Sequence, residues 1–130
     1  MNALIIGGRN QNKLQIAKNL FEFNEYFDGK RDDFEKLSNT KILYGLNHLI
    51  NRMIDNGFGD EKIKEFILNN NYDIVISDEI GCAVVEIEKN TRRTVELTGR
   101  ITCNLAEKSD NVIRIFCGIP QVIKGELNWK

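Results

Sequence analysis

Three short apolar runs, separated by segments with helical periodicity, constrain the fold of this chain more than any other feature. Ala3–Ile6 and Ile74–Ile76 are continuous, and the third run, Val112–Cys117, is apolar except for Arg114. Continuous apolar runs of this length are typical of strands buried on both faces. Because strands that alternate with helices are joined by right-handed crossovers, the pattern predicts a three-layer α/β fold around a parallel sheet of few strands.

The segments between these runs predict the helices and one hairpin. Gly118-Ile119-Pro120 favours a tight turn, after which Gln121–Lys124 is expected to return as an antiparallel edge strand. Asn24–Leu37 is rich in charges of both signs and is expected to be irregular or partly helical. The helices expected are Asn12–Phe23, an amphipathic helix from Ser38 or Asn39 to near Asn56, a helix from Asp60 to Asn69, and Thr91–Lys108.

Composition and charge exclude several classes of protein. The chain carries 18 Lys and Arg against 19 Asp and Glu without a basic run, which argues against a nucleic-acid partner. Ala3–Ile6 is far shorter than the roughly 20 residues that cross a bilayer, so no membrane or export signal is expected. Three widely spaced cysteines support neither a disulfide framework nor a metal site. We therefore expect one cytoplasmic domain over residues 1–130 with reduced thiols.

The turn after the first apolar run partly matches a phosphate-binding loop. Such loops use glycines to turn backbone N–H groups toward one anion, a lysine to reach the β and γ phosphates, and a hydroxyl to hold Mg²⁺. Asn12 replaces the second glycine and tolerates positive φ, but Leu14 replaces the hydroxyl and cannot coordinate Mg²⁺. The alternative is a plain strand-to-helix turn. The candidate phosphate-binding residues are Gly7, Gly8, Arg9, Asn10, Gln11, Asn12 and Lys13.

Two carboxylates, Asp78 and Glu79, follow the second apolar run. Ligands of open α/β sheets bind beyond the carboxyl ends of the strands, so these two residues and Lys13 are the catalytic candidates. Solvated loop acids are the alternative. His48, the only histidine, lies far from the apolar side of its expected helix and is expected to be exposed without a role, and no metal ligand set is assigned. Arg92, Arg93 and Arg100 are expected on a solvated helix face.

The carboxyl-terminal half carries further motifs in a fixed order. These are Val75–Gly81, Leu97-Thr98-Gly99-Arg100-Ile101 with Asn104-Leu105-Ala106, and Asp110-Asn111-Val112 leading to Phe116–Pro120. In this order they resemble the adenosylcobinamide kinase / adenosylcobinamide-phosphate guanylyltransferase family of cobalamin biosynthesis. At the amino terminus, Lys13 aligns with the lysine of that family's phosphate-binding loop.

The resemblance implies a RecA-like nucleotide-binding fold, GTP or ATP and a corrinoid as ligands, and a homo-oligomer, often a trimer. Arg100 becomes a candidate contact to nucleotide or substrate. This sequence differs from the family at residues that carry the reaction. The family's guanylyl-accepting histidine has no counterpart within Asn24–Leu37, and Tyr44 stands where the family has an acidic residue. We therefore expect a divergent nucleotide-binding protein with weak or no turnover. The alternative is a non-catalytic scaffold or interaction protein that retains only the fold.

Overall fold

A computed structural model describes residues 1–8, 11–79 and 89–126 of the chain. The strands are β1 (Ala3–Gly7), β2 (Phe27–Asp28), β3 (Ile42–Tyr44), β4 (Ile74–Asp78), β5 (Asn111–Phe116) and β6 (Ile119–Lys124). They form one sheet in the order β2-β3-β4-β1-β5-β6. All neighbouring strands are parallel except β5 and β6, which are antiparallel.

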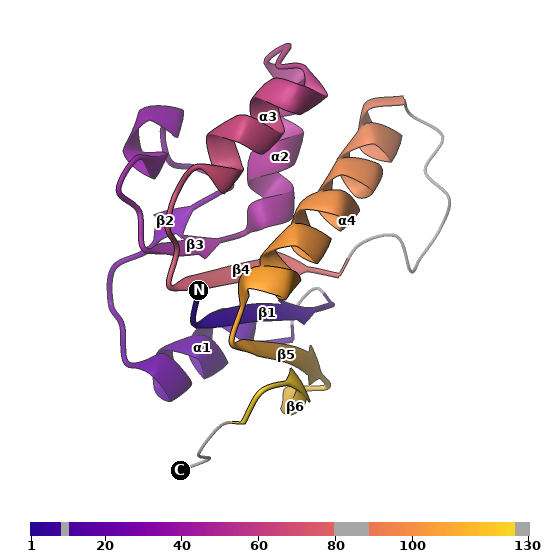
Figure 1. The fold of residues 1–130 in the computed structure, drawn as a ribbon. Helices are drawn as coiled ribbons and strands as arrows, with labels where there is room; N and C mark the ends of the chain where they lie inside the picture. Colours follow the sequence, from indigo (N-terminus) through magenta and orange to yellow (C-terminus); the bar gives the residue numbers. More distant parts are fainter. Residues whose placement is uncertain (9–10, 80–88, 127–130) are drawn as a thin grey trace.

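The helices cover the two faces of this sheet (Figure 1). They are α1 (Lys13–Phe21), α2 (Leu46–Asp55), α3 (Asp60–Leu68) and α4 (Lys89–Lys108), with a 3-10 turn η1 (Phe34–Leu37). Because successive strand residues point to opposite faces, Leu4 packs in the core beneath α2, α3 and α4, whereas Ile5 packs with Ala17 of α1. The predicted three-layer, mostly parallel, RecA-like fold with an antiparallel carboxyl-terminal edge is confirmed.

The long helix expected from Ser38 or Asn39 is wrong in its first half. Ile42–Tyr44 forms the strand β3, which pairs with β4 in parallel, and α2 begins only at Leu46. Gly45 joins the two elements with a φ of 84° that disfavours other residues, and its N–H donates to the carbonyl of Ile76 at 2.9 Å. The apolar spacing of a strand that runs straight into a helix happened to match a helical period.

The segment expected to be irregular or partly helical, Asn24–Leu37, contains a 3-10 turn and also a short strand that was not predicted. Phe27 of β2 pairs with Leu43 of β3, so β2 forms an edge of the sheet. The expected helix Asn12–Phe23 is confirmed over Lys13–Phe21. It ends where Glu22 takes a φ of 52°, a left-handed conformation that stops helical hydrogen bonding.

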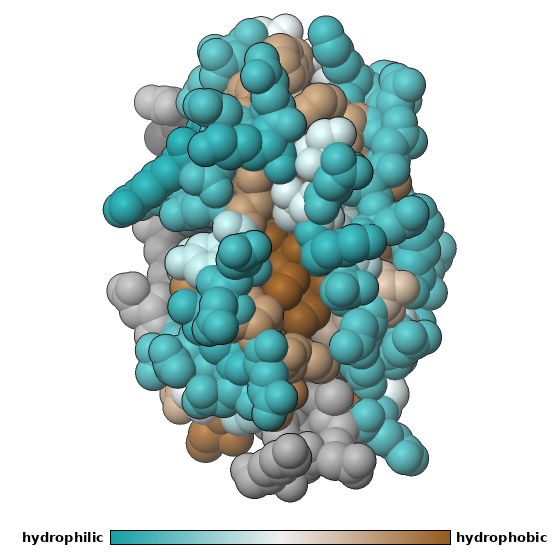
Figure 2. Space-filling view, turned by 90° about the vertical axis from the view of Figure 1, so that its left-hand side faces the viewer, coloured by the Kyte–Doolittle hydropathy of each residue, from teal (hydrophilic) through white to brown (hydrophobic). Residues whose placement is uncertain are grey.

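The surface agrees with the balanced composition. Figure 2 shows hydrophilic side chains over most of the visible face, with a narrow hydrophobic strip in its centre. Across the ranges that the structure describes, none of the helices is both long enough and apolar enough to cross a bilayer.

Candidate functional site

A cavity of about 680 Å³ opens at the carboxyl ends of β1, β3 and β4. The helix that follows β1 leaves toward one face of the sheet, and the helices that follow β3 and β4 leave toward the other (Figure 1). Ligands of open α/β sheets bind at such a switch point, beyond the ends of the strands. The cavity lies between the loop that precedes α1 and the turn that follows β2.

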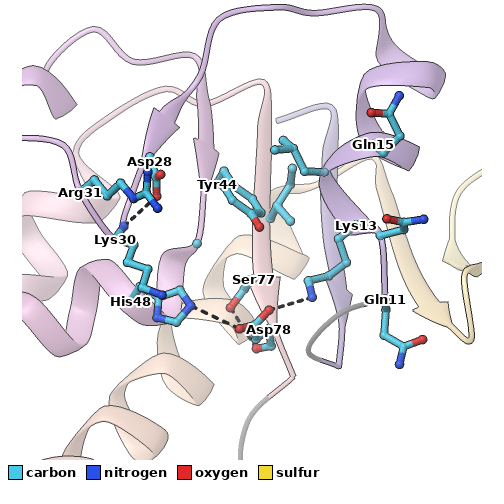
Figure 3. A pocket seen from close by; sticks show the side chains of 14 residues that line it. Gln11, Lys13, Gln15, Asp28, Lys30, Arg31, Tyr44, His48, Ser77 and Asp78 are labelled. Carbon is cyan, nitrogen blue, oxygen red and sulfur yellow. Dashed lines mark hydrogen bonds and ion pairs between the residues drawn. The ribbon is translucent and has the colours of Figure 1, made fainter.

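Asp78, the last residue of β4, is the polar centre of this cavity (Figure 3). Its Oδ1 lies 2.7 Å from Lys13 Nζ, and its Oδ2 accepts a hydrogen bond from Asn47 Nδ2 at 3.3 Å. The amide side chain of Asn47 also accepts a hydrogen bond from the Asp78 N–H, at 3.1 Å. Asn47 is buried at the start of α2, so this paired contact fixes the carboxylate relative to the helix.

Lys13 is buried, with 6% of its surface exposed. Besides the ion pair with Asp78, its Nζ donates to the carbonyl of Gly8 at 2.6 Å. Gly7 makes room for this arrangement, because a Cβ there would lie 2.7 Å from the Ile115 carbonyl oxygen and 3.2 Å from Lys13 Cδ. A buried ammonium group needs such partners, since an isolated charge is costly to remove from water.

The other residues of the proposed phosphate loop are placed as follows. Asn12 has a φ of 63° and immediately precedes α1, where its side chain makes no capping hydrogen bond. Leu14 lines the cavity and packs against the core beneath α1, and Gln11 lines the same end of the cavity. Gly8 contributes the carbonyl that accepts from Lys13, whereas Arg9 and Asn10 lie outside the described residues.

Glu79 differs from Asp78 in the direction of its side chain. Its Oε2 lies 3.1 Å from Arg114 Nε of β5, and its N–H donates to the Gly7 carbonyl at 2.7 Å. It is not among the residues that line the cavity. Adjacent residues at a strand end point to opposite sides, so of the two predicted carboxylates the structure places Asp78 beside Lys13 and turns Glu79 toward Arg114.

His48 was expected to be exposed without a role, but it is half-buried, with 36% of its side chain exposed, and its role stays a prediction. It lies in the first turn of α2, lines the cavity, and places Nε2 at 3.5 Å from Asp78 Oδ2. Figure 3 shows His48 and Lys13 pointing at the carboxylate from opposite sides. Helical phase did not predict this position, because it does not show which residues of a helix lie beside the end of a neighbouring strand.

The arginines of α4 lie away from the cavity. Arg93 is not purely solvated, because its Nη2 lies 2.8 Å from Asp60 Oδ1 and ties α4 to the start of α3. Arg92 and Arg100 are exposed, as the sequence predicts. Arg100 does not line the cavity.

Several cavity residues were missed by sequence reasoning. Lys30 and Arg31 come from the turn after β2, and Tyr44 ends β3 between that turn and Lys13 (Figure 3). The pKa of Tyr44 is raised above its ordinary value by burial, then by the negative charges of Asp78 and Asp28. The signal available in the sequence was Gly29-Lys30-Arg31, a glycine followed by two cations after a short apolar segment.

Comparison with protein families agrees with this architecture. The family model described as cobinamide kinase / cobinamide phosphate guanyltransferase matches residues 47–123, from the first turn of α2 to β6. The match includes Asn47, His48 and Asp78 and begins after the Lys13 loop. No curated protein matches the chain. The matched segment exceeds half of the chain, and its helices and strands form the carboxyl-terminal part of the sheet and cavity described above. The protein therefore belongs to the cobinamide kinase / cobinamide phosphate guanyltransferase (CobU) family.

Proposed function

We propose that the chain binds GTP or ATP in this cavity, with the phosphates against Lys13 and the start of α1, and that its further substrate is a corrinoid. The observation that carries the proposal is a buried lysine at the start of a helix, where the strands of an α/β sheet end. A helix amino terminus favours anions, and the first turn of α1 contains no acidic residue that would repel them. Family membership supports both substrate classes.

Binding would exchange one partner of Lys13 for another. In the structure its Nζ is neutralised by Asp78. A phosphate that approaches Lys13 would compete with that carboxylate, while Asn47 and His48 remain close enough to stabilise the released side chain. We therefore expect a modest affinity, because each bond made to the ligand replaces one already present in the protein.

The residues of the cavity do not fit a dedicated Mg²⁺ site. Leu14 offers no oxygen where phosphate loops place a hydroxyl, and Asp78 is engaged by Lys13 and Asn47. The described part of the chain contains no group of three or more His, Cys, Asp or Glu side chains that could hold a metal ion. We therefore expect weak or no phosphoryl or guanylyl transfer. We also propose that the protein acts in the cytoplasm.

Calorimetric titration with GTP and ATP, with and without Mg²⁺, tests the proposal. We expect binding that Lys13→Ala weakens by at least about tenfold, since a charge-assisted bond to phosphate is lost. Lys64→Ala, a change of the same charge on α3, should leave the affinity unchanged. The absence of heat at millimolar nucleotide would remove the proposal.

Transfer is tested separately with α-labelled GTP. We expect no labelled protein after acid-free denaturation. A covalent guanylyl adduct that disappears in His48→Ala would contradict the expectation of lost transfer, because His48 is the only histidine of the chain and lies in the cavity.

A second candidate is a scaffold that has kept the fold without binding nucleotide. The closed Lys13–Asp78 pair favours it, as does the exposed apolar surface formed by Phe116, Ile119 and Ile123 at the β5–β6 edge. We propose that this edge contributes to a homo-oligomer, a trimer being one form. Light scattering should then show an assembly that Ile123→Glu dissociates, and a monomeric wild-type protein would argue against it.

A further inference from the structure

The turn after β2 is held by hydrogen bonds within its own backbone and by the carboxylates of Asp28 and Asp32. The Gly29 N–H donates to the Tyr44 carbonyl at 2.7 Å, and the N–H groups of Arg31 and Asp32 both donate to the Asp28 carbonyl. Asp28 Oδ1 accepts from the Lys30 N–H at 3.0 Å, and Asp32 Oδ2 accepts from the Asp28 N–H at 2.9 Å. The turn therefore has a defined shape before any ligand arrives.

The Arg52 side chain of α2 and the backbone of Gly45, between β3 and α2, also hold the turn. The Arg52 guanidinium donates to the carbonyls of Gly29 and Asp32, each at 2.8 Å. Gly29 is packed so closely that an added Cβ would lie 2.2 Å from the Gly45 carbonyl oxygen. The turn is thus attached to the strand-to-helix junction that also positions His48.

Lys30 and Arg31 are the two cations that this turn presents to the cavity (Figure 3). Within residues 1–8, 11–79 and 89–126, neither side chain has a hydrogen bond or an ion pair. Among the described residues, the charged lining consists of three cations, with Lys13 as the third, and the carboxylates of Asp28 and Asp78. Since Lys13 and Asp78 neutralise each other and Asp28 offsets one of the two remaining cations, one surplus positive charge is left on the turn after β2.

We propose that Lys30 and Arg31 form a second anion subsite, which takes a phosphate or phosphomonoester group across the cavity from Lys13. The inference rests on the proposed function only in assigning the Lys13 end to the nucleotide. The second anion is either the far end of the same nucleotide or the phosphate of a separate molecule. Tyr44, between the two ends, offers an aromatic surface to the part of the ligand that joins or separates them.

Inorganic phosphate, followed by backbone amide NMR of the full chain, tests the subsite without nucleotide. We expect phosphate to shift the amide signals of residues 30 and 31 in the wild-type protein and in Lys13→Ala. In Lys30→Ala/Arg31→Ala the phosphate affinity should fall at least about tenfold. The matched control Lys64→Ala/Lys108→Ala removes two positive charges far from the cavity and should respond like the wild type.

The outcomes separate this inference from the proposed function. Phosphate shifts at residues 30 and 31 without any nucleotide binding would support the subsite and remove the nucleotide proposal. Nucleotide binding with no phosphate response, or an equal response in Lys30→Ala/Arg31→Ala, would overturn the subsite alone. Lys30→Gln/Arg31→Gln removes both charges but keeps polar side chains, and unchanged amide signals outside the turn would show that a lost response does not come from altered folding.

The source of the second anion follows from adding phosphate to protein saturated with GTP or ATP. If the nucleotide already shifts residues 30 and 31 and blocks the phosphate response, one molecule spans both ends. If phosphate still acts, the subsite belongs to a second molecule. Either result supports two anion positions in one cavity.

Discussion

The two walls of the cavity use different means to hold their positive charges. On one wall, Lys13 is buried and its charge is cancelled by Asp78. On the opposite wall, Lys30 and Arg31 are exposed, and the hydrogen bonds lie in the backbone beneath them. A cation that is already paired must give up a partner to bind a ligand, whereas a cation on a rigid turn is ready to bind. We therefore expect the wall without a recognisable motif to bind an anion more readily.

The largest effect is expected from adding a methyl group beneath the turn. Gly29→Ala should lower the free energy of unfolding by about 3 kcal/mol, because its Cβ would lie 2.2 Å from a backbone oxygen that cannot move freely. Gly8→Ala is the matched control on the opposite wall, where the nearest atom would be Gln11 Cγ at 3.6 Å. Urea denaturation measures both, and equal losses would show that the turn is not rigid.

Removing a cation should cost stability on one wall only. Lys13→Ala should destabilise the protein by about 2 kcal/mol, since it leaves the largely buried Asp78 carboxylate without its cation. Lys30→Ala should change the stability by less than about 0.5 kcal/mol, because its side chain is exposed. In a double-mutant cycle, Asp78→Asn should recover part of the Lys13→Ala loss. Independent effects of the two substitutions would contradict the ion pair.

Loosening the turn should have a smaller, local effect. Arg52→Lys cannot donate to the Gly29 and Asp32 carbonyls in the same forked geometry. We expect a loss of about 1 kcal/mol in unfolding free energy, with faster hydrogen exchange at Gly29 and Arg31 and unchanged exchange at Lys13. Arg92→Lys, on the exposed side of α4, is the control. Uniformly faster exchange in Arg52→Lys would place the effect in the whole core instead.

The smallest effect is expected on the pKa of Tyr44, which compares the influence of the two walls through the charges of Asp78 and Asp28. Its raised pKa means that the folded protein holds the proton more tightly than the unfolded chain, so this contribution to stability is complete below pH 10 and is lost as the pH rises through the folded pKa. Asp78→Asn should lower the pKa more than Asp28→Asn, because the Asp78 charge is the larger cause. Tyrosine-selective NMR separates Tyr44 from Tyr72, whose pKa burial raises to about 12. Equal shifts would show that neither wall dominates, and a reversed order would show that Asp28 has the larger effect.

Local sequence patterns were sufficient to predict those strands and helices whose own residues show a clear apolar pattern. Ala3–Ile6 and Ile74–Ile76 lie in β1 and β4, because burial on both faces requires continuous apolar side chains. The third run lies in β5 up to Phe116, and Cys117 falls outside the strand. Lys13 could be singled out because a lysine at that spacing after a glycine turn must lie near the strand ends. The strand β3 was missed because it has only three residues and is followed at once by a helix, so it is too short to show the alternation of a strand.

The site depended on contacts between distant parts of the chain. Asp78 and Glu79 are neighbours in sequence, yet only the direction of each side chain at the end of β4 decides which of them meets Lys13. Likewise, Lys30 and Arg31 reach the cavity because β2 pairs with β3, and His48 reaches it because Gly45 starts the helix beside β4. The pairing of strands that lie far apart in the sequence leaves no pattern in the neighbouring residues.

The amino-acid sequence determined the layers of the fold, the family motifs of the carboxyl-terminal half and the lysine at the start of α1, because burial and turn chemistry act over a few neighbouring residues. Only the tertiary structure decided that this lysine is neutralised by Asp78 and that the free positive charge lies on the turn after β2. The reason is physical: charge pairing depends on distances of a few ångströms between strand ends, which sheet pairing sets and residue order does not.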